Sequence, residues 1–202
     1  MSTAQMLANG EYAVPAGKLA VIVTYLEMLS RAATRDVPLR TGTTFRQKVT
    51  PDPDWYRDVF RRVGSQDWLW YERQSLADTP LRAILDDPDV QIFTLTQDSK
   101  DEALLELDFR TPGQCELAYF GLTAKLIGSG AGRYLMNEAI TRAWDAGISR
   151  LHVHTCTHDS PLALDFYIRS GFVPYKRTVD IDDDPRLTGV LPGNCATWIP
   201  VL

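Results

Sequence analysis

A glycine-rich segment beyond the middle of the chain has the residue types of an anion-binding loop. Residues 126–133 read Leu-Ile-Gly-Ser-Gly-Ala-Gly-Arg, between a mostly apolar run at 115–120 and a stretch with apolar residues at helical spacing. A glycine turn that leads into a helix leaves backbone N–H groups unpaired at the positive end of the helix dipole. We therefore expect this segment to bind an anion, most simply a phosphate or pyrophosphate.

The glycine spacing argues against two common phosphate-binding loops. Gly128, Gly130 and Gly132 are not followed by the Lys and Ser/Thr of a P-loop. No acidic residue ends an obvious second strand, as a dinucleotide-binding fold requires. Nucleoside triphosphates and NAD are therefore disfavoured, and a different phosphate ligand stays open as an alternative.

The elements that position this loop are a strand, a long helix, a second strand and a short helix within residues 114–172. Gly147 ends the long helix, whose apolar stripe consists of Leu135, Met136, Ala139, Ile140, Ala143 and Trp144. In the second strand, alternation places His152 and His154 on one face and Leu151, Val153 and Thr155 on the other.

The remaining segments predict an α/β fold with a mixed, mainly antiparallel sheet flanked by helices. Residues 1–17 look like a loose arm or a hairpin edge, and residues 31–53 like an extended loop. No linker divides 18–202, so we expect one domain there. A helix should begin at Pro53 and end at Gly64, and a short one should span 79–87. The expected strands are 18–29, 90–97, 103–109, 172–181 and 195–201.

Composition excludes several classes of protein. The 202 residues carry a net charge of −5, which does not suggest a nucleic-acid partner. Its three cysteines are too few for a disulfide framework or a metal site, and they indicate a reducing, cytoplasmic compartment. The sequence shows no signal peptide and no apolar run near the roughly 20 residues of a membrane span.

Two motifs together resemble the GNAT superfamily of acetyl-CoA-dependent N-acetyltransferases. Residues 127–132, Ile-Gly-Ser-Gly-Ala-Gly, are similar to the family's loop Gln/Arg-x-x-Gly-x-Gly/Ala, with Ile127 in place of Gln or Arg. Downstream, Ala163, Tyr167, Gly171 and Phe172 match the pattern Ala-x-x-x-Tyr-x-x-x-Gly-Phe. The family often has Asn where Ser160 stands.

The resemblance implies an enzyme that transfers an acetyl group from acetyl-CoA directly to a primary amine, on a small molecule or a peptide. It implies no metal, and it assigns cofactor contacts to Leu122, Ile127, Gly128, Ser129, Gly130, Ala131, Gly132, Arg133, Ser160, Ala163 and Tyr167. A non-catalytic acyl-CoA-binding sensor or subunit is the alternative. The apolar residues 195–202 either complete the sheet or exchange with a second copy in a homodimer.

Three residues are candidates for proton transfer. The resemblance implies that Tyr167 is the acid that protonates the leaving thiolate. Glu116, a carboxylate in an apolar strand, is the leading base, with a pKa that burial should raise, unless it lies at the wet end of the strand or pairs with an arginine. His154 is the second candidate base, and a hydrogen-bonded structural histidine is the alternative.

Two further clusters each have two interpretations. The aromatic run at 68–71, Trp-Leu-Trp-Tyr, is either core packing or a wall of the acceptor site. The acidic run at 180–184 is either a solvated turn or a group of charges that attracts a cationic acceptor.

Overall fold

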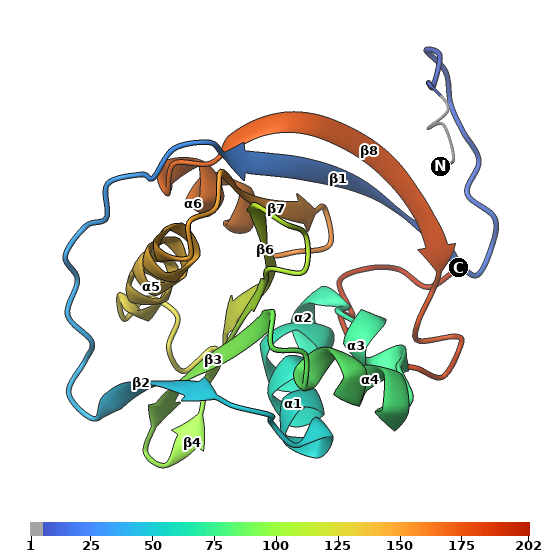
Figure 1. The fold of residues 1–202 in the computed structure, drawn as a ribbon. Helices are drawn as coiled ribbons and strands as arrows, with labels where there is room; N and C mark the ends of the chain where they lie inside the picture. The colour runs from blue at the N-terminus through green and yellow to red at the C-terminus, as the bar shows by residue number, and fades with distance from the viewer. Residues whose placement is uncertain (1–5) are drawn as a thin grey trace.

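The computed structural model describes residues 6–202 and contains one eight-stranded sheet in the order β2-β3-β5-β6-β7-β1-β8, with β4 paired to β3. Most neighbours are antiparallel, but β6 and β7 are parallel. Helices lie on both sides of the sheet, and the long β1 and β8 form a ribbon that curves away from the rest (Figure 1). The expected mixed α/β sheet with flanking helices is confirmed.

The second half of the chain follows the sequence prediction closely. Strand β6 leads through the glycine loop into α5, and β7 leads into α6 and β8. The bounds are β6 (Gln114–Leu122), α5 (Ala131–Asp145), β7 (Arg150–Cys156), α6 (Ala163–Arg169) and β8 (Val173–Asp183). The histidines of β7 lie on one face, and Leu151, Val153 and Thr155 are buried on the other, as alternation predicts.

The first half supplies the edge of the sheet and a group of short helices. The bounds are β1 (Lys18–Met28), β2 (Thr43–Lys48), α1 (Pro53–Phe60), η1 (Arg61–Ser65), α2 (Gln66–Trp68), α3 (Glu72–Ser75), α4 (Asp78–Leu85), β3 (Val90–Gln97), β4 (Lys100–Asp101) and β5 (Ala103–Asp108). Helix α1 begins where Asp52 accepts a hydrogen bond from the amide of Asp54, with Pro53 in its first turn.

Three sequence expectations are wrong. Residues 31–53 contain β2, a polar edge strand whose only large apolar residue is Phe45. Gly64 does not end the helix but lies within the π-helical turn η1, where the ring of Trp70 packs so closely that an added Cβ would fall 2.0 Å from its Cδ2 atom. Residues 195–201 form turns instead of a strand.

Only part of the expected N-terminal arm is described. Residues 1–5 lie outside the described part of the chain. Residues 6–17 contain neither helix nor strand. Nowhere in residues 6–202 is a helix both long and apolar enough to cross a bilayer.

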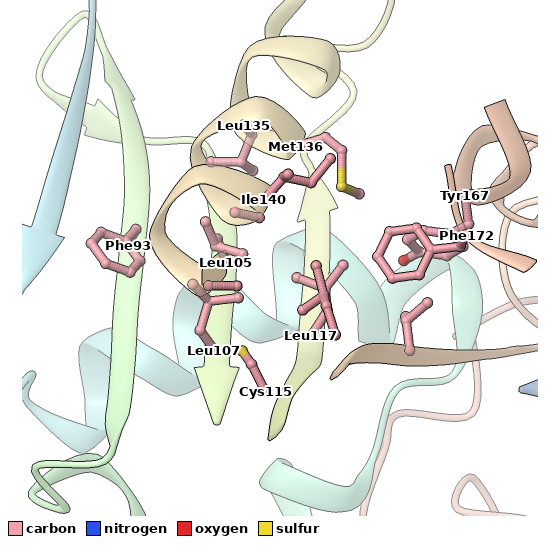
Figure 2. Packing of buried hydrophobic residues seen from close by; sticks show 14 of the residues in the cluster. Phe93, Leu105, Leu107, Cys115, Leu117, Leu135, Met136, Ile140, Tyr167 and Phe172 are labelled. Atoms are coloured by element: carbon pink, nitrogen blue, oxygen red, sulfur yellow. The ribbon is translucent and has the colours of Figure 1, made fainter. Parts of the chain in front are cut away.

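Two hydrophobic cores lie on opposite faces of the sheet. The larger lies beneath α5, where Leu135 and Met136 pack against Leu105 and Leu117 (Figure 2). The smaller lies beneath α1 and α4 and contains Tyr56 and Phe60. The sheet therefore separates an α5–α6 side from an α1–α4 side, and each side contributes differently to the site.

The parallel strands β6 and β7 pair over only three positions and then separate. The pairs are Gln114 with Arg150, Cys115 with Leu151 and Glu116 with His152. Two residues after Glu116, Ala118 is left without a partner on β5, because Leu117 pairs with Leu107 and Tyr119 with Glu106. Such a bulge increases the bend of a strand. The sheet therefore opens between the C-terminal halves of β6 and β7.

Candidate functional site

A cavity of about 530 Å³ lies where β6 and β7 separate. Residues 117–122 of β6 line one wall, and Val153, His154 and Cys156 of β7 line the other. Groups from both sides of the sheet complete the lining, so the opening reaches from the α5–α6 side to the α1–α4 side. Ligand sites are typically concave, with a few polar groups in a mostly apolar lining, and this cavity fits that description.

The glycine loop forms the α5–α6 end of the cavity. Gly128 and Gly130 have φ angles of 78° and 87°, a region that favours glycine, and Gly130 is the N-cap of α5. Gly130 has no side chain to cap this helix end, and among residues 6–202 its first turn has one side-chain acceptor, Ser129 Oγ, which accepts a long 3.4 Å bond from the Ala131 amide. The first turn of α5 therefore presents N–H donors that an anion can accept.

Most of the residues that the sequence predicted to contact the cofactor line this cavity, and two do not. Those that line it are Leu122, Ile127, Gly128, Gly130, Gly132, Arg133, Ser160, Ala163 and Tyr167. Ser129 and Ala131 do not: the Ser129 hydroxyl donates to the carbonyl of Leu126, and Ala131 is buried beneath the loop. Ile127, at the position of the family's Gln or Arg, is 60% exposed.

Three arginines gather beside the loop, two of which the sequence did not single out. Burial lowers the pKa of Arg133, and the positive charges of Arg35 and Arg169 lower it further. Among the described residues, the closest carboxylate to any of the three is Asp165, 3.9 Å from Arg169. Three neighbouring cations with so little compensation favour the binding of an anion.

Glu116 and His154, the two candidate bases, lie next to each other. The His154 Nδ1 atom is 3.4 Å from Glu116 Oε1, and His154 lines the cavity whereas Glu116 lies behind it. The hydrogen bond between them raises the pKa of His154 and lowers the pKa of Glu116. The expected raised pKa of Glu116 is therefore wrong, because the neighbouring imidazole outweighs its burial.

Tyr167 projects from α6 and lines the cavity, with its ring largely buried in the larger core. Its ring packs edge-on against Phe120, Phe166 and Phe172, and Figure 2 shows it with Phe172 at the margin of the larger core. Burial raises the pKa of its hydroxyl well above the usual value, so the group stays protonated at neutral pH. A buried phenol of this kind is a hydrogen-bond donor for a ligand in the cavity.

The aromatic run at 68–71 forms the α1–α4 end of the cavity and also packs against neighbouring residues. All four of its residues line the cavity. The Trp70 indole donates to Asp159 at 2.9 Å, and Asp159 also accepts from the hydroxyl of Thr155 and the amide of Cys156. Nothing in the sequence indicated this role of Asp159, because Trp70 lies 89 residues before it in the chain.

The C-terminal residues support this aromatic wall from behind. Leu69 packs against Leu191, Cys195 and Ile199. The buried Arg186 pairs with Asp184 at 2.7 Å and donates to the carbonyls of Cys195, Ala196 and Ile199. These bonds explain why residues 195–201 fold as turns: their carbonyl groups bind a guanidinium instead of a neighbouring strand.

Neither the cysteines nor the histidines suggest other chemistry. Cys156 lines the cavity, but burial raises its pKa to about 12, so it is a thiol and a poor nucleophile at neutral pH. In the described residues, no group of three or more His, Cys, Asp or Glu side chains could hold a metal ion.

Comparison with known proteins identifies the family. The model of the acetyltransferase (GNAT) family matches residues 54–172, more than half of the chain. No curated protein sequence matches this one.

Solved structures share the fold at low identity. A GCN5-related N-acetyltransferase from Sphaerobacter thermophilus superposes with a TM-score of 0.62 and 14% identity over 81% of this chain and 52% of its own. The ribosomal-protein-S18-alanine N-acetyltransferase of Escherichia coli superposes with a TM-score of 0.54 and 15% identity, over 70% of this chain and 94% of its own. For an aminoglycoside acetyltransferase from an uncultured soil sample, the TM-score is 0.52 and the identity 15%, over 64% of this chain and 87% of its own.

The match to larger proteins is partial. The chain spans 63% of a Staphylococcus epidermidis protein of unknown function and about half of the Sphaerobacter protein. The family model nevertheless covers the segment that carries the glycine loop, Glu116 and Tyr167. The chain belongs to the GNAT family of acetyltransferases.

Proposed function

We propose that the protein is an N-acetyltransferase that moves an acetyl group from acetyl-CoA to a primary amine by direct transfer in a ternary complex. The observation that carries the proposal is one cavity that contains both an uncapped helix N-terminus and the Glu116–His154 pair. The first suits a phosphorylated cofactor, and the second suits the deprotonation of an amine.

The lining of the cavity fits CoA. The backbone of residues 127–133 would hold the pyrophosphate, and the arginine cluster of Arg35, Arg133 and Arg169 would attract the phosphate groups. From Leu117 and Val153 onward, the facing edges of β6 and β7 have no strand between them, so their amides and carbonyls can bond the amide-containing arm of the cofactor. Between the glycine loop and the strand edges, the cavity is lined by Leu122, Ser160, Ala163 and Tyr167.

His154 is the proposed base, and Glu116 positions it. If Nδ1–H faces Glu116, the other ring nitrogen is free to accept the amine proton. The neutral amine then attacks the thioester carbonyl, so that a C–N bond forms and the C–S bond breaks. The charge of Glu116 stabilises the resulting imidazolium. This assignment keeps both sequence candidates in the reaction and gives them different roles.

Tyr167 is the proposed donor to the leaving sulfur. Its pKa lies well above that of an ordinary thiol, so complete proton transfer to the thiolate is uphill. A hydrogen bond from the hydroxyl still stabilises the negative charge that develops on sulfur. The geometry therefore favours Tyr167 as a hydrogen-bond donor in the transition state, with the amine proton available to neutralise the thiolate afterwards.

The test is a calorimetric titration with acetyl-CoA of the wild type and of Gly132→Glu and Gly132→Gln. Gly132 lines the cavity in the first turn of α5, and an added Cβ would only contact Leu122 Cδ1 at 3.5 Å. An acidic residue in this turn is favourable for the helix, so the fold should persist. Because Glu and Gln have the same size, a difference between them reports charge.

We expect the wild type to bind acetyl-CoA and the Glu variant to bind it about tenfold more weakly than the Gln variant, as one added like charge near a phosphate predicts. A wild type that does not bind acetyl-CoA, or two variants of equal affinity, would count against the proposal.

A further inference from the structure

The two ends of the cavity carry opposite charge. Among the described residues, two arginines and no lysine line the cavity, namely Arg133 and Arg169. Both lie on the α5–α6 side. On the other side the lining includes the carboxylates of Glu72, Asp180 and Asp182. A cofactor that carries phosphates matches the first end, which leaves the acidic end for the acceptor.

The alternation of β8 directs two of these carboxylates into the cavity. Asp180 pairs with Val21 and Asp182 with Leu19, and both partners on β1 also line the cavity. Asp183, between Asp182 and the buried Asp184, is not part of the lining and pairs with Lys18 at 2.5 Å. The sequence interpretation of 180–184 as one charged run therefore separates into inward and outward residues.

The inward carboxylates have little compensation. Among the described residues, neither Asp180, Asp182 nor Glu72 has a basic group within 4.0 Å, and Glu72 only accepts a 3.4 Å bond from the hydroxyl of Tyr119. Burial raises the pKa of Tyr71 to about 12, and the charges of Asp182, Glu72 and, least of the three, Asp183 contribute, so these carboxylates act on the same phenol. Negative charge is thus concentrated around Tyr71.

The walls between the carboxylates and His154 are apolar and aromatic. On β1, the lining residues Leu19, Val21, Val23 and Tyr25 run from the partner of Asp182 to the partner of His154, and Trp68, Trp70 and Tyr71 also line the cavity. Such surfaces bury a hydrocarbon chain, and aromatic faces also attract cations. A small polar amine would leave this surface in contact with water.

We infer that the acceptor is a diamine or polyamine, in which one amino group reaches His154 and a second cationic group, beyond an apolar spacer, lies among Glu72, Asp180 and Asp182. This inference rests on the proposed acetyl transfer, since it concerns the acceptor end of the same cavity. The second cation supplies the charge that the three carboxylates lack, and the spacer covers the aromatic wall.

The experiment compares two probes that differ only in the second amine, 1,6-diaminohexane and hexylamine. Each is titrated calorimetrically into the full chain saturated with CoA, which cannot donate an acetyl group, so that binding is measured without turnover. The variants are the double substitution Asp180→Asn/Asp182→Asn and the matched control Asp183→Asn, which removes charge from the same strand outside the cavity.

We expect the wild type to bind the diamine about five- to tenfold more tightly than the monoamine, the range that two partly exposed ion pairs supply. The double variant keeps only Glu72 of the three carboxylates, so its preference should fall to within about twofold, and Asp183→Asn should keep the wild-type preference. The inference is overturned if the wild type binds the two probes equally, or if Asp183→Asn removes the preference as fully as the double variant.

The two proposals fail separately in these measurements. A protein that binds acetyl-CoA with the expected Gly132 dependence but shows no diamine preference keeps the proposed function and loses the acceptor class. A protein that does not bind acetyl-CoA loses both.

Discussion

The Nδ1 atom of His154 lies 3.4 Å from Oε1 of Glu116, although the two residues come from neighbouring strands that pair over only three positions. Glu116 is in the last paired position, where its partner on β7 is His152, and His154 lies two residues beyond His152. The pair therefore forms where the strands begin to separate, which places the imidazole in the cavity with the carboxylate behind it.

We expect Glu116→Gln to move the acidic limb of the pH–rate profile to lower pH. The hydrogen bond to Glu116 raises the pKa of His154, so a base of this kind becomes active only as the pH rises through that raised value. A neutral amide stabilises the imidazolium less; the pKa falls, and the limb follows it downward. The maximal rate should drop about ten- to hundredfold, because the ring is held less well.

The measurement is kcat/KM against pH for acetyl transfer to an amine, with His152→Gln as the control. His152 lies on the same face of β7 but does not line the cavity, so its loss should leave the limb in place. A limb that does not move in the Glu116 variant would separate this pair from the reaction.

Tyr167→Phe should lower kcat about a hundredfold and leave the affinity for acetyl-CoA within about twofold, the pattern of a group that acts mainly in the transition state. The ring packing against Phe120, Phe166 and Phe172 is retained, so the thermal midpoint should change little. Tyr25→Phe, which removes a different hydroxyl from the cavity lining, is the matched control. Slow turnover that is equal in the wild type and Tyr167→Phe would instead favour a non-catalytic acyl-CoA-binding protein.

Arg73→Met should destabilise the fold by about 3–5 kcal/mol, because it leaves the Glu106 carboxylate buried without its cation. Arg73 Nη2 lies 2.7 Å from Glu106 Oε1, and Glu106, fully buried, also accepts from the hydroxyl of Tyr56. Since Arg73 follows Glu72, this pair also fixes α3 beside the acidic end of the cavity.

The free energy of unfolding in urea measures this effect. Arg31→Met, which breaks the exposed pair with Asp145, should cost no more than about 1 kcal/mol. Arg73→Met/Glu106→Leu should recover part of the loss, since the unpaired charge is gone. Equal losses in Arg73→Met and Arg31→Met would show that the buried pair contributes no more than a surface one.

The elements around the glycine loop could be predicted because their signals are local. The apolar stripe of α5 and the alternation of β7 each depend on neighbours in sequence, and both are confirmed. Strand β2 was missed because none of its residues is fully buried and Phe45 is the one that packs against the hydrophobic core, so its sequence has no apolar alternation. The apolar composition of residues 195–201 predicted a strand. They form turns because Arg186 donates hydrogen bonds to their carbonyl groups, a contact that the segment's own sequence does not reveal.

Which site residues meet depends on strand register and loop contacts that a single sequence does not encode locally. Glu116 and His154 were each identifiable by type, but their pairing and the resulting fall in the pKa of Glu116 follow from the parallel register of β6 and β7. The contribution of Arg35 to the arginine cluster could not be predicted for the same reason, because no neighbouring residue in the sequence places it beside Arg133.

The opening between β6 and β7 is lined from both faces of the sheet, with the glycine loop and its arginines on one face and the acidic, aromatic wall on the other. Two molecules that approach from opposite faces do not block each other's path. Neither substrate therefore has to arrive first, and either product can depart while the other is still bound. The separation of two strands after three paired residues thus predicts a random kinetic order.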